Sequence, residues 1–188
     1  MKKTFAILLL FLSVFMLWEN VSAASMRRRD DFMKPQAGIW FGPGMPLFDL
    51  KDKVEPALGG GAFFRLNTPL TYFKTGVELG YQKHDSQGVN GISLVPIYGN
   101  VLFLLPIKFP MNFQFKLGAG GVKVYIKPEE KQQFDPLFMA GLEVSFMAGR
   151  MVNFGLRFDY MVIYEKHISG AKYNGYFFNT GLTLYFNL

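Results

Sequence analysis

The stretch that decides the fold is MVNFGLRFDYMVIYE, residues 151–165. Every second position carries a large apolar side chain: Val152, Phe154, Leu156, Phe158, Tyr160, Val162 and Tyr164. The positions between them carry Asn153, Gly155, Arg157, Asp159 and Glu165, with Met161 and Ile163 near the end. Because successive side chains of a β-strand point to opposite faces, this period of two predicts a strand and contradicts a helix. At this length, an apolar face opposite a polar one is typical of a transmembrane strand with lipid outside and a polar interior.

The same alternation predicts seven further strands. They cover residues 36–42, 58–67, 73–82, 92–105, 111–127, 137–147 and 173–188, of which the first is short and ambiguous. Residues 92–105 are apolar on both faces and contain Pro96, where we expect a bulge or a kink because proline donates no ladder hydrogen bond. In residues 111–127 the apolar positions shift by one across Gly120 and Gly121, which predicts a β-bulge.

The connections between these strands alternate in length. Tight turns are predicted at residues 67–69, 107–110 and 149–150, and longer polar connections at residues 43–56, 84–91, 127–136 and 166–172. This alternation predicts an all-β protein, an eight-stranded antiparallel up-and-down transmembrane β-barrel with both termini on the periplasmic side. Closure is required because lipid offers no partner to an open sheet edge. The alternative is a soluble barrel such as a lipocalin, whose apolar face would point inwards.

The amino-terminal segment is typical of an export signal. Lys2 and Lys3 precede an apolar run at residues 5–17, and Val21-Ser22-Ala23 provides the small residues of a cleavage site. We therefore expect a cleaved signal peptide at residues 1–23, a disordered arm at residues 24–35 and one barrel domain at residues 36–188. Cleavage one residue later and an uncleaved anchor are the alternatives. The mature part contains no second run of about 20 apolar residues, so we expect no helical span there.

Composition and charge argue against several function classes. The chain has no cysteine and only two histidines, His84 and His167, so we expect no disulfide, no lipid anchor, no metal and no cofactor. The formal charge of +6 is scattered apart from residues 27–29, which two aspartates follow. We therefore expect no nucleic-acid partner and ascribe the excess to anionic lipid headgroups. The sequence contains no phosphate-binding loop and no pair of catalytic carboxylates.

The last predicted strand carries the motif Asn179-x-Gly181-x-x-Leu184-x-Phe186. This motif resembles the carboxyl-terminal signal that the outer-membrane barrel assembly machinery reads, although the chain ends at Leu188 where phenylalanine or tryptophan is common. Over nearly all of the mature chain, the sequence resembles the small eight-stranded outer-membrane β-barrels, a family that includes the OmpA-like and OmpX-like barrel domains. Residues 95–101 and 117–121 resemble the central strands of such barrels.

The resemblance implies export through the Sec pathway to the bacterial outer membrane. There, membrane lipids and the barrel assembly machinery are the expected partners, and we expect a monomer. We favour a structural or surface-interaction role, in adhesion or envelope integrity, over an enzyme, with loops at residues 49–55, 84–90 and 127–133 facing an extracellular ligand. We assign six aromatic residues to the outer face and its interfacial girdles: Trp40, Tyr72, Tyr81, Tyr164, Tyr173 and Tyr176.

The polar positions of the strands predict a network inside the barrel. Its charged members are Arg65, Lys74, Glu78, Lys116, Glu143, Arg157 and Asp159, and Gln82, Gln114, Asn153 and Asn179 add hydrogen-bonding groups. An eight-stranded barrel is just wide enough for side chains to fill it, and buried charges of opposite sign should pair. We therefore expect a polar plug that stabilises the barrel; the alternative is a narrow ion path through rearranging pairs.

A weak candidate for catalysis is His167 with Ser169, in the last external loop. A histidine beside a serine could supply a base and a nucleophile. The spacing resembles the lipid A deacylase barrels of the outer membrane, but Gly170 stands where that family has asparagine. Residues 175–183 also lack the acidic residue that would orient the imidazole. An exposed polar loop is therefore the favoured interpretation, and a lipid-modifying enzyme the alternative.

Overall fold

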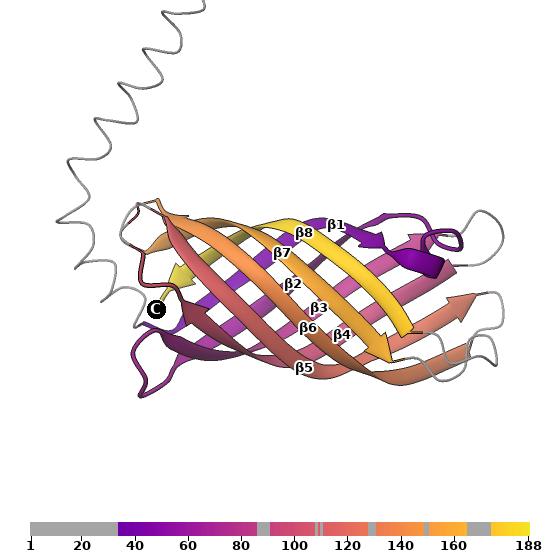
Figure 1. Cartoon of the computed structure of the whole chain (residues 1–188), viewed down its shortest axis with the longest axis horizontal. Coiled ribbons are helices and arrows are strands. Elements are labelled where there is room, and N and C mark those ends of the chain that lie inside the picture. Colours follow the sequence, from indigo (N-terminus) through magenta and orange to yellow (C-terminus); the bar gives the residue numbers. More distant parts are fainter. Residues whose placement is uncertain are drawn as a thin grey trace, which may run out of the picture.

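The computed structural model describes residues 34–85, 91–107, 109, 111–127, 131–148, 151–164 and 174–188. Its elements are β1 (Gln36–Pro46), the 3-10 turn η1 (Phe48–Leu50), β2 (Ala57–Asn67), β3 (Phe73–Asp85), β4 (Gly91–Leu104), β5 (Asn112–Lys127), β6 (Lys131–Met147), β7 (Val152–Tyr164) and β8 (Asn174–Asn187). Each strand pairs antiparallel with the next, and β8 pairs with β1, so the sheet closes into a barrel (Figure 1). The predicted eight-stranded up-and-down barrel is confirmed.

Residues 1–33, which include the predicted signal peptide and most of the arm, lie outside the described residues. Those two assignments therefore stay predictions. Within the part that is described, no helix is long and apolar enough to cross a membrane.

The stagger of the strands sets the width of the barrel. Paired residues can be followed once around the wall, from Gln36 through Arg65, Gly76, Asn100, Gly118, Met139, Met161 and Phe177 to Pro46. The path returns to β1 at residue 46 after starting at residue 36, so the shear is ten residues. Eight strands with this stagger tilt by about 35–45° and enclose a space that side chains can fill.

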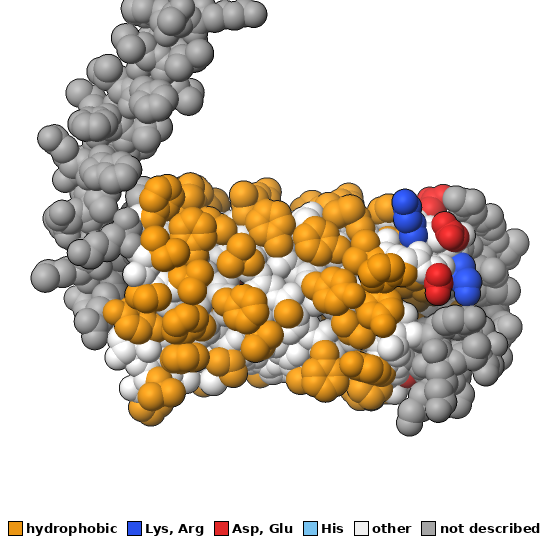
Figure 2. Space-filling model, viewed as in Figure 1, with side chains coloured by type: hydrophobic (Ala, Val, Ile, Leu, Met, Phe, Trp, Pro, Cys, Tyr) orange, Lys and Arg blue, Asp and Glu red, His pale blue; other side chains and the backbone are white. Residues whose placement is uncertain are grey.

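The apolar face of the strands points outwards. The exposed side chains include Ile39, Phe41, Phe64, Leu66, Val77, Leu79, Ile97, Val101, Phe115, Leu117, Phe138, Phe154, Leu156, Leu182 and Phe186. In Figure 2 they form a broad belt, and charged side chains gather at the end away from the carboxyl terminus. An apolar surface of this extent is unfavourable in water and favourable in hydrocarbon. The soluble-barrel alternative is therefore wrong, and the chain is a transmembrane barrel.

The bulge predicted in β5 is absent. This strand pairs without a break across Gly120 and Gly121, with β4 on one side and β6 on the other. The apolar positions change face because the barrel interior itself changes: Lys116 is buried inside near one end, and Val122 is buried inside near the other. At Pro96 the pairing of β3 with β4 is interrupted, but the same register resumes beyond it, so this site has no bulge either.

The connection predicted at residues 127–136 is largely strand. β5 continues to Lys127 and β6 begins at Lys131, and their ends pair with each other. Pro136 fits within β6 because β7 begins to pair only at Leu137, so the proline occupies an unpaired edge. The short connections and the carboxyl terminus lie together at one end of the barrel (Figure 1).

Candidate functional site

Two charged side chains meet across the barrel interior near the end with the short turns. Arg65 of β2 donates two hydrogen bonds to Glu143 of β6, from Nη1 to Oε1 at 3.1 Å and from Nη2 to Oε2 at 2.6 Å. Both side chains are fully buried. The Arg65 guanidinium also lies 4.0 Å from the ring centre of Phe63 and 5.4 Å from that of Tyr185. Because β2 and β6 are not neighbours, this ion pair ties opposite walls together.

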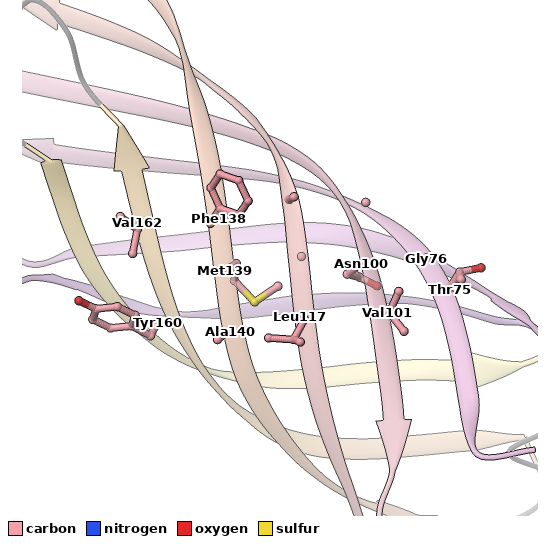
Figure 3. A pocket seen from close by; sticks show the side chains of 13 residues that line it. Thr75, Gly76, Asn100, Val101, Leu117, Phe138, Met139, Ala140, Tyr160 and Val162 are labelled. Carbon is pink, nitrogen blue, oxygen red and sulfur yellow. The ribbon is translucent and has the colours of Figure 1, made fainter.

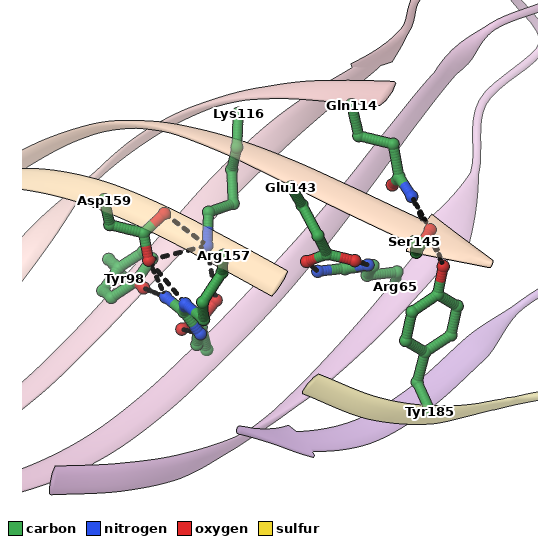
Figure 4. Close-up of polar contacts among 10 residues, drawn as sticks. Arg65, Tyr98, Gln114, Lys116, Glu143, Ser145, Arg157, Asp159 and Tyr185 are labelled. Atoms are coloured by element: carbon green, nitrogen blue, oxygen red, sulfur yellow. Dashed lines mark hydrogen bonds and ion pairs between the residues drawn. The ribbon is translucent and has the colours of Figure 1, made fainter. Parts of the chain in front are cut away.

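A second cluster joins β3, β5 and β7. Lys116 Nζ lies 3.4 Å from a carboxylate oxygen of Glu78 and 3.2 Å from one of Asp159. Arg157 pairs with Glu78 at 2.6 Å and also with Asp159, two residues along the same strand. The Tyr98 hydroxyl, on β4, accepts a hydrogen bond from Arg157 Nη2 at 3.3 Å (Figure 4).

The charges in these two clusters balance. Arg65, Lys116 and Arg157 supply three positive charges, and Glu78, Glu143 and Asp159 supply three negative ones. All six side chains are at least 98% buried. Removing water from a charge is costly, and that cost is offset only where ion pairs and hydrogen bonds are close and numerous. The sequence named all six residues; the structure brings them together as two groups.

Lys74, the seventh predicted member, lies apart from these clusters at the end of the barrel with the short turns. Its Nζ donates a hydrogen bond to Asn67 Oδ1 at 2.7 Å and one to the carbonyl of Lys34. At the same end, Gln36 donates to Asn187 at 3.0 Å, and the Tyr185 hydroxyl donates to Ser145 at 2.8 Å. Polar groups therefore also fill the barrel where it opens towards the termini.

The other half of the interior is mainly apolar, with Gln82, His84, Asp135 and Asn179 as buried polar residues, and the sequence did not predict this change. A buried cluster from β4 to β8 contains Leu94, Tyr98, Val122, Val124, Leu137, Met139, Met161, Ile163 and Phe177. Leu50 of η1 packs against this cluster from above, and Val54 in the same connection is buried. Because β5 runs from Lys116 to Val122 towards the external connections, the apolar cluster lies on the extracellular side of the charges.

The external connection between β1 and β2 is held down on the barrel. The Glu55 amide donates to the Asp85 carbonyl at 2.9 Å, and the Leu47 amide donates to the Tyr176 carbonyl at 2.8 Å. His84 Nδ1 lies 2.9 Å from the Glu55 carbonyl oxygen, and its ring centre lies 5.1 Å from that of Phe177. The connection therefore covers the apolar cluster.

Trp40 was predicted on the outer face, and this prediction is wrong. Its side chain is 5% exposed and lies inside the barrel, where the Arg157 guanidinium is 4.3 Å from its ring centre. The neighbouring strands β2 and β3 leave space for the indole because Gly61 and Gly80 have no side chain. A Cβ at Gly61 would lie 2.5 Å from the indole, and a Cβ at Gly80 would lie 3.0 Å from it. Trp40 lies between Ile39 and Phe41, which are both exposed on the outer face. The alternation of side chains along β1 therefore predicts that Trp40 points into the barrel.

The remaining predicted residues have different outcomes. Tyr81 and Tyr164 are exposed on the outer face, as predicted. His167, Ser169 and Tyr173 lie outside the described residues, so the weak catalytic candidate is not placed. Among the residues that the structure describes, no group of acidic or histidine side chains is arranged to hold a metal ion.

The residues of the predicted assembly signal lie in β8, apart from Leu188, which directly follows the strand. Asn179 is buried in the interior, where its Oδ1 accepts a hydrogen bond from Gln82 at 3.0 Å. Leu184 pairs with Ile39 of β1 and Phe186 pairs with Ala37. Leu188 is exposed at the end of the strand, and Gly181 pairs with Arg157. These positions close the barrel; their role in assembly stays a prediction.

No protein-family model and no curated protein matches this sequence. The fold, however, is similar to that of Neisserial surface protein A, with a TM-score of 0.61 over 82% of this chain and 97% of that chain, at 8% identity. OprG, an outer membrane protein of Pseudomonas aeruginosa, matches over 82% of this chain and 95% of its own, with 11% identity and a TM-score of 0.49.

The chain therefore has the fold of the small outer-membrane β-barrels, as the sequence predicted. The apolar belt around the closed barrel requires a lipid environment. The protein is accordingly a transmembrane β-barrel of eight strands with the fold of the outer-membrane barrels.

Proposed function

We propose that this protein is a sealed outer-membrane barrel whose function lies at its external surface, in adhesion or envelope integrity. The observation that supports this proposal is the filling of the interior by two layers. Ion-paired side chains occupy the half near the termini, and a packed apolar cluster occupies the other half. Ions crossing the second layer would lose most of their hydration, because its few polar groups, such as Gln82, His84 and Asn179, already bond to one another or to the backbone, and this loss is strongly unfavourable. A scaffold is therefore favoured over the narrow pore.

The connection between β1 and β2 supports a role in recognition. Leu50 and Val54 anchor it from below, so its charged side chains, including Lys51 and Asp52, stay exposed on a fixed backbone. Phe48 is 67% exposed with a φ of 53°, and its ring packs edge-on against Tyr176 at 5.2 Å. Such backbone geometry is unfavourable for a bulky side chain and is more frequent at binding sites than elsewhere. A rigid surface of this kind loses little entropy on binding.

Single-channel recording in planar bilayers tests whether the barrel is sealed. We expect no steady conductance from the purified, refolded protein at moderate voltage. A reproducible conductance that changes in Arg157→Ala would overturn the sealed barrel and make the ion path the correct interpretation.

Adhesion assays test the surface role directly. Bacteria that display the wild-type protein are compared with bacteria that display a variant in which the exposed residues Asp49, Lys51, Asp52 and Lys53 are replaced by serine, while the anchors Leu50 and Val54 are kept. We expect the variant to reach the outer membrane at the same level and to bind less well to surfaces coated with extracellular-matrix proteins. Equal binding by both strains would contradict recognition through this connection.

The enzymatic alternative needs a separate test, because His167 and Ser169 lie outside the described residues. The refolded protein is incubated with native outer-membrane lipids in detergent micelles, and the lipids are analysed by mass spectrometry. We expect unchanged lipids. A lost or transferred acyl chain that disappears in Ser169→Ala would establish an enzyme.

A further inference from the structure

On the described part of the outer wall, charged side chains are rare and occur on one side only. At the outward positions of the strands, as far as the structure describes them, the charged residues are Lys83, Asp85, Lys123 and Lys127. All four are close to the external ends of β3 and β5. Lys83 forms an ion pair with Asp85 at 3.3 Å, so Lys123 and Lys127 leave this part of the wall with a net positive charge, at the height where the apolar belt ends.

These lysines surround a shallow surface on β4. Lys83 pairs with Ser93, whose partner on the other side is Tyr125, and Lys123 pairs with Val95. Lys83 on β3 and Lys123 on β5 are thus separated by two strand spacings across the sheet and by two residues along the strands. Their backbones are therefore about 12 Å apart. The outward side chains of β4 at these two positions are Ser93 and Val95. Lys123 Nζ lies 4.9 Å from the ring centre of Tyr125, and tyrosine is typical of the membrane–water boundary.

A groove opens in the apolar belt below this basic surface. It has a volume of about 710 Å³ and runs over the outer wall from β3 to β7. Its floor is low because Gly99, Ala119 and Ala140 have small or no side chains, and Phe138 and Tyr160 project beside it (Figure 3). Ala119 is four residues from Lys123 on the same strand, about 13 Å away, so the groove begins below the lysines.

We propose that the outer wall of β3 to β7 is a binding site for a phosphorylated lipid of the outer leaflet. The lysines hold the phosphate at the membrane surface, and the groove holds an acyl chain in the hydrocarbon layer. The lysines lie at the depth of the lipid phosphate, and the groove lies at the depth of the acyl chains. Each lysine near a membrane surface contributes about 1 kcal/mol of attraction to anionic groups. A soluble protein partner could reach the lysines but not the groove.

Lipid binding to the full barrel, refolded in detergent, tests the headgroup half of this site. The probe is lipid A with both phosphates, titrated while native mass spectrometry records the fraction of protein that carries it. We expect Lys123→Gln/Lys127→Gln to bind about 25-fold more weakly, at about five-fold per lysine. The matched control is Lys51→Gln/Lys53→Gln, which removes two exposed lysines at the same end of the barrel but away from the wall. This control should bind as the wild type does.

The same titration with dephosphorylated lipid A tests the groove. We expect Ala119→Leu, which fills the groove, to weaken the binding of both lipids, whereas Ala62→Leu on the outer face of β2 should change neither. Each variant is first shown to be folded by its heat-dependent mobility on detergent gels.

Three results would overturn the proposal. Equal weakening by both lysine pairs would mean diffuse attraction to the whole end of the barrel, and unchanged binding in all variants would mean no site. If Ala119→Leu instead converted a dimeric wild-type protein into a monomer, the groove would be a contact between two copies of this chain. The site does not depend on the proposed surface role, because adhesion by residues 49–55 is measured separately.

Discussion

Each charged side chain in the two interior clusters is held by a partner on another strand, so single substitutions there should be costly. In Arg65→Met, the Glu143 carboxylate remains buried without its partner, and we expect a loss of about 3–5 kcal/mol in the free energy of unfolding. Replacing both residues, as Arg65→Met/Glu143→Leu, removes the buried charge and should recover most of this loss. Urea unfolding in phosphatidylcholine vesicles measures both variants. A double variant as unstable as the single one would mean that the ion pair itself stabilises the barrel.

Substitutions on the lipid-facing side of the strands change the free energy of membrane insertion. Phe158 is exposed on the belt between the buried residues Arg157 and Asp159. We expect Phe158→Arg to reduce insertion, because arginine at the bilayer midplane on the lipid face costs about 2–4 kcal/mol. The yield of folded protein in vesicles measures the effect, and Phe158→Leu is the control. Normal assembly of the arginine variant would contradict the outward orientation of this side chain.

At the scale of the element, β8 is the strand that completes the ring. Its last residues pair with β1 and with β7 at once, through Leu184 and Phe186. We expect removal of residues 184–188 to leave two sheet edges unpaired in lipid and to prevent stable insertion. The heat-dependent shift on detergent gels should then disappear. A truncated protein that still inserts would show that the wall closes without these pairs.

At the scale of the whole molecule, stability should depend little on salt. The ion pairs that join the walls are buried, and salt screens exposed charges far more strongly than buried ones. The exposed pair Lys83–Asp85 contributes little in any case. We expect the same urea midpoint in phosphatidylcholine vesicles at low salt and at about 1 M salt. A midpoint that falls steeply with salt would mean that water reaches the clusters.

The sequence by itself determined the number of strands, their approximate ends and the direction of most side chains. In residues 151–165 the period of two assigns Phe158 to lipid and Asp159 to the interior, and both assignments are confirmed. This works because the faces of a strand alternate whatever its partners are. Trp40 obeys the same parity: the preference of tryptophan for interfacial girdles predicts the outer face, but its strand position, between the exposed Ile39 and Phe41, places it inside.

Only the tertiary structure decided which interior residues meet. Arg65 reaches Glu143 because the ring closes with a shear of ten, which sets the height of β2 against that of β6. No single strand encodes this stagger, since it results from all eight pairings together. For the same reason, the change from a charged half to an apolar half was mistaken for a bulge at Gly120 and Gly121. Alternation shows which face a residue is on, whereas its neighbours across the barrel depend on how the sheet closes.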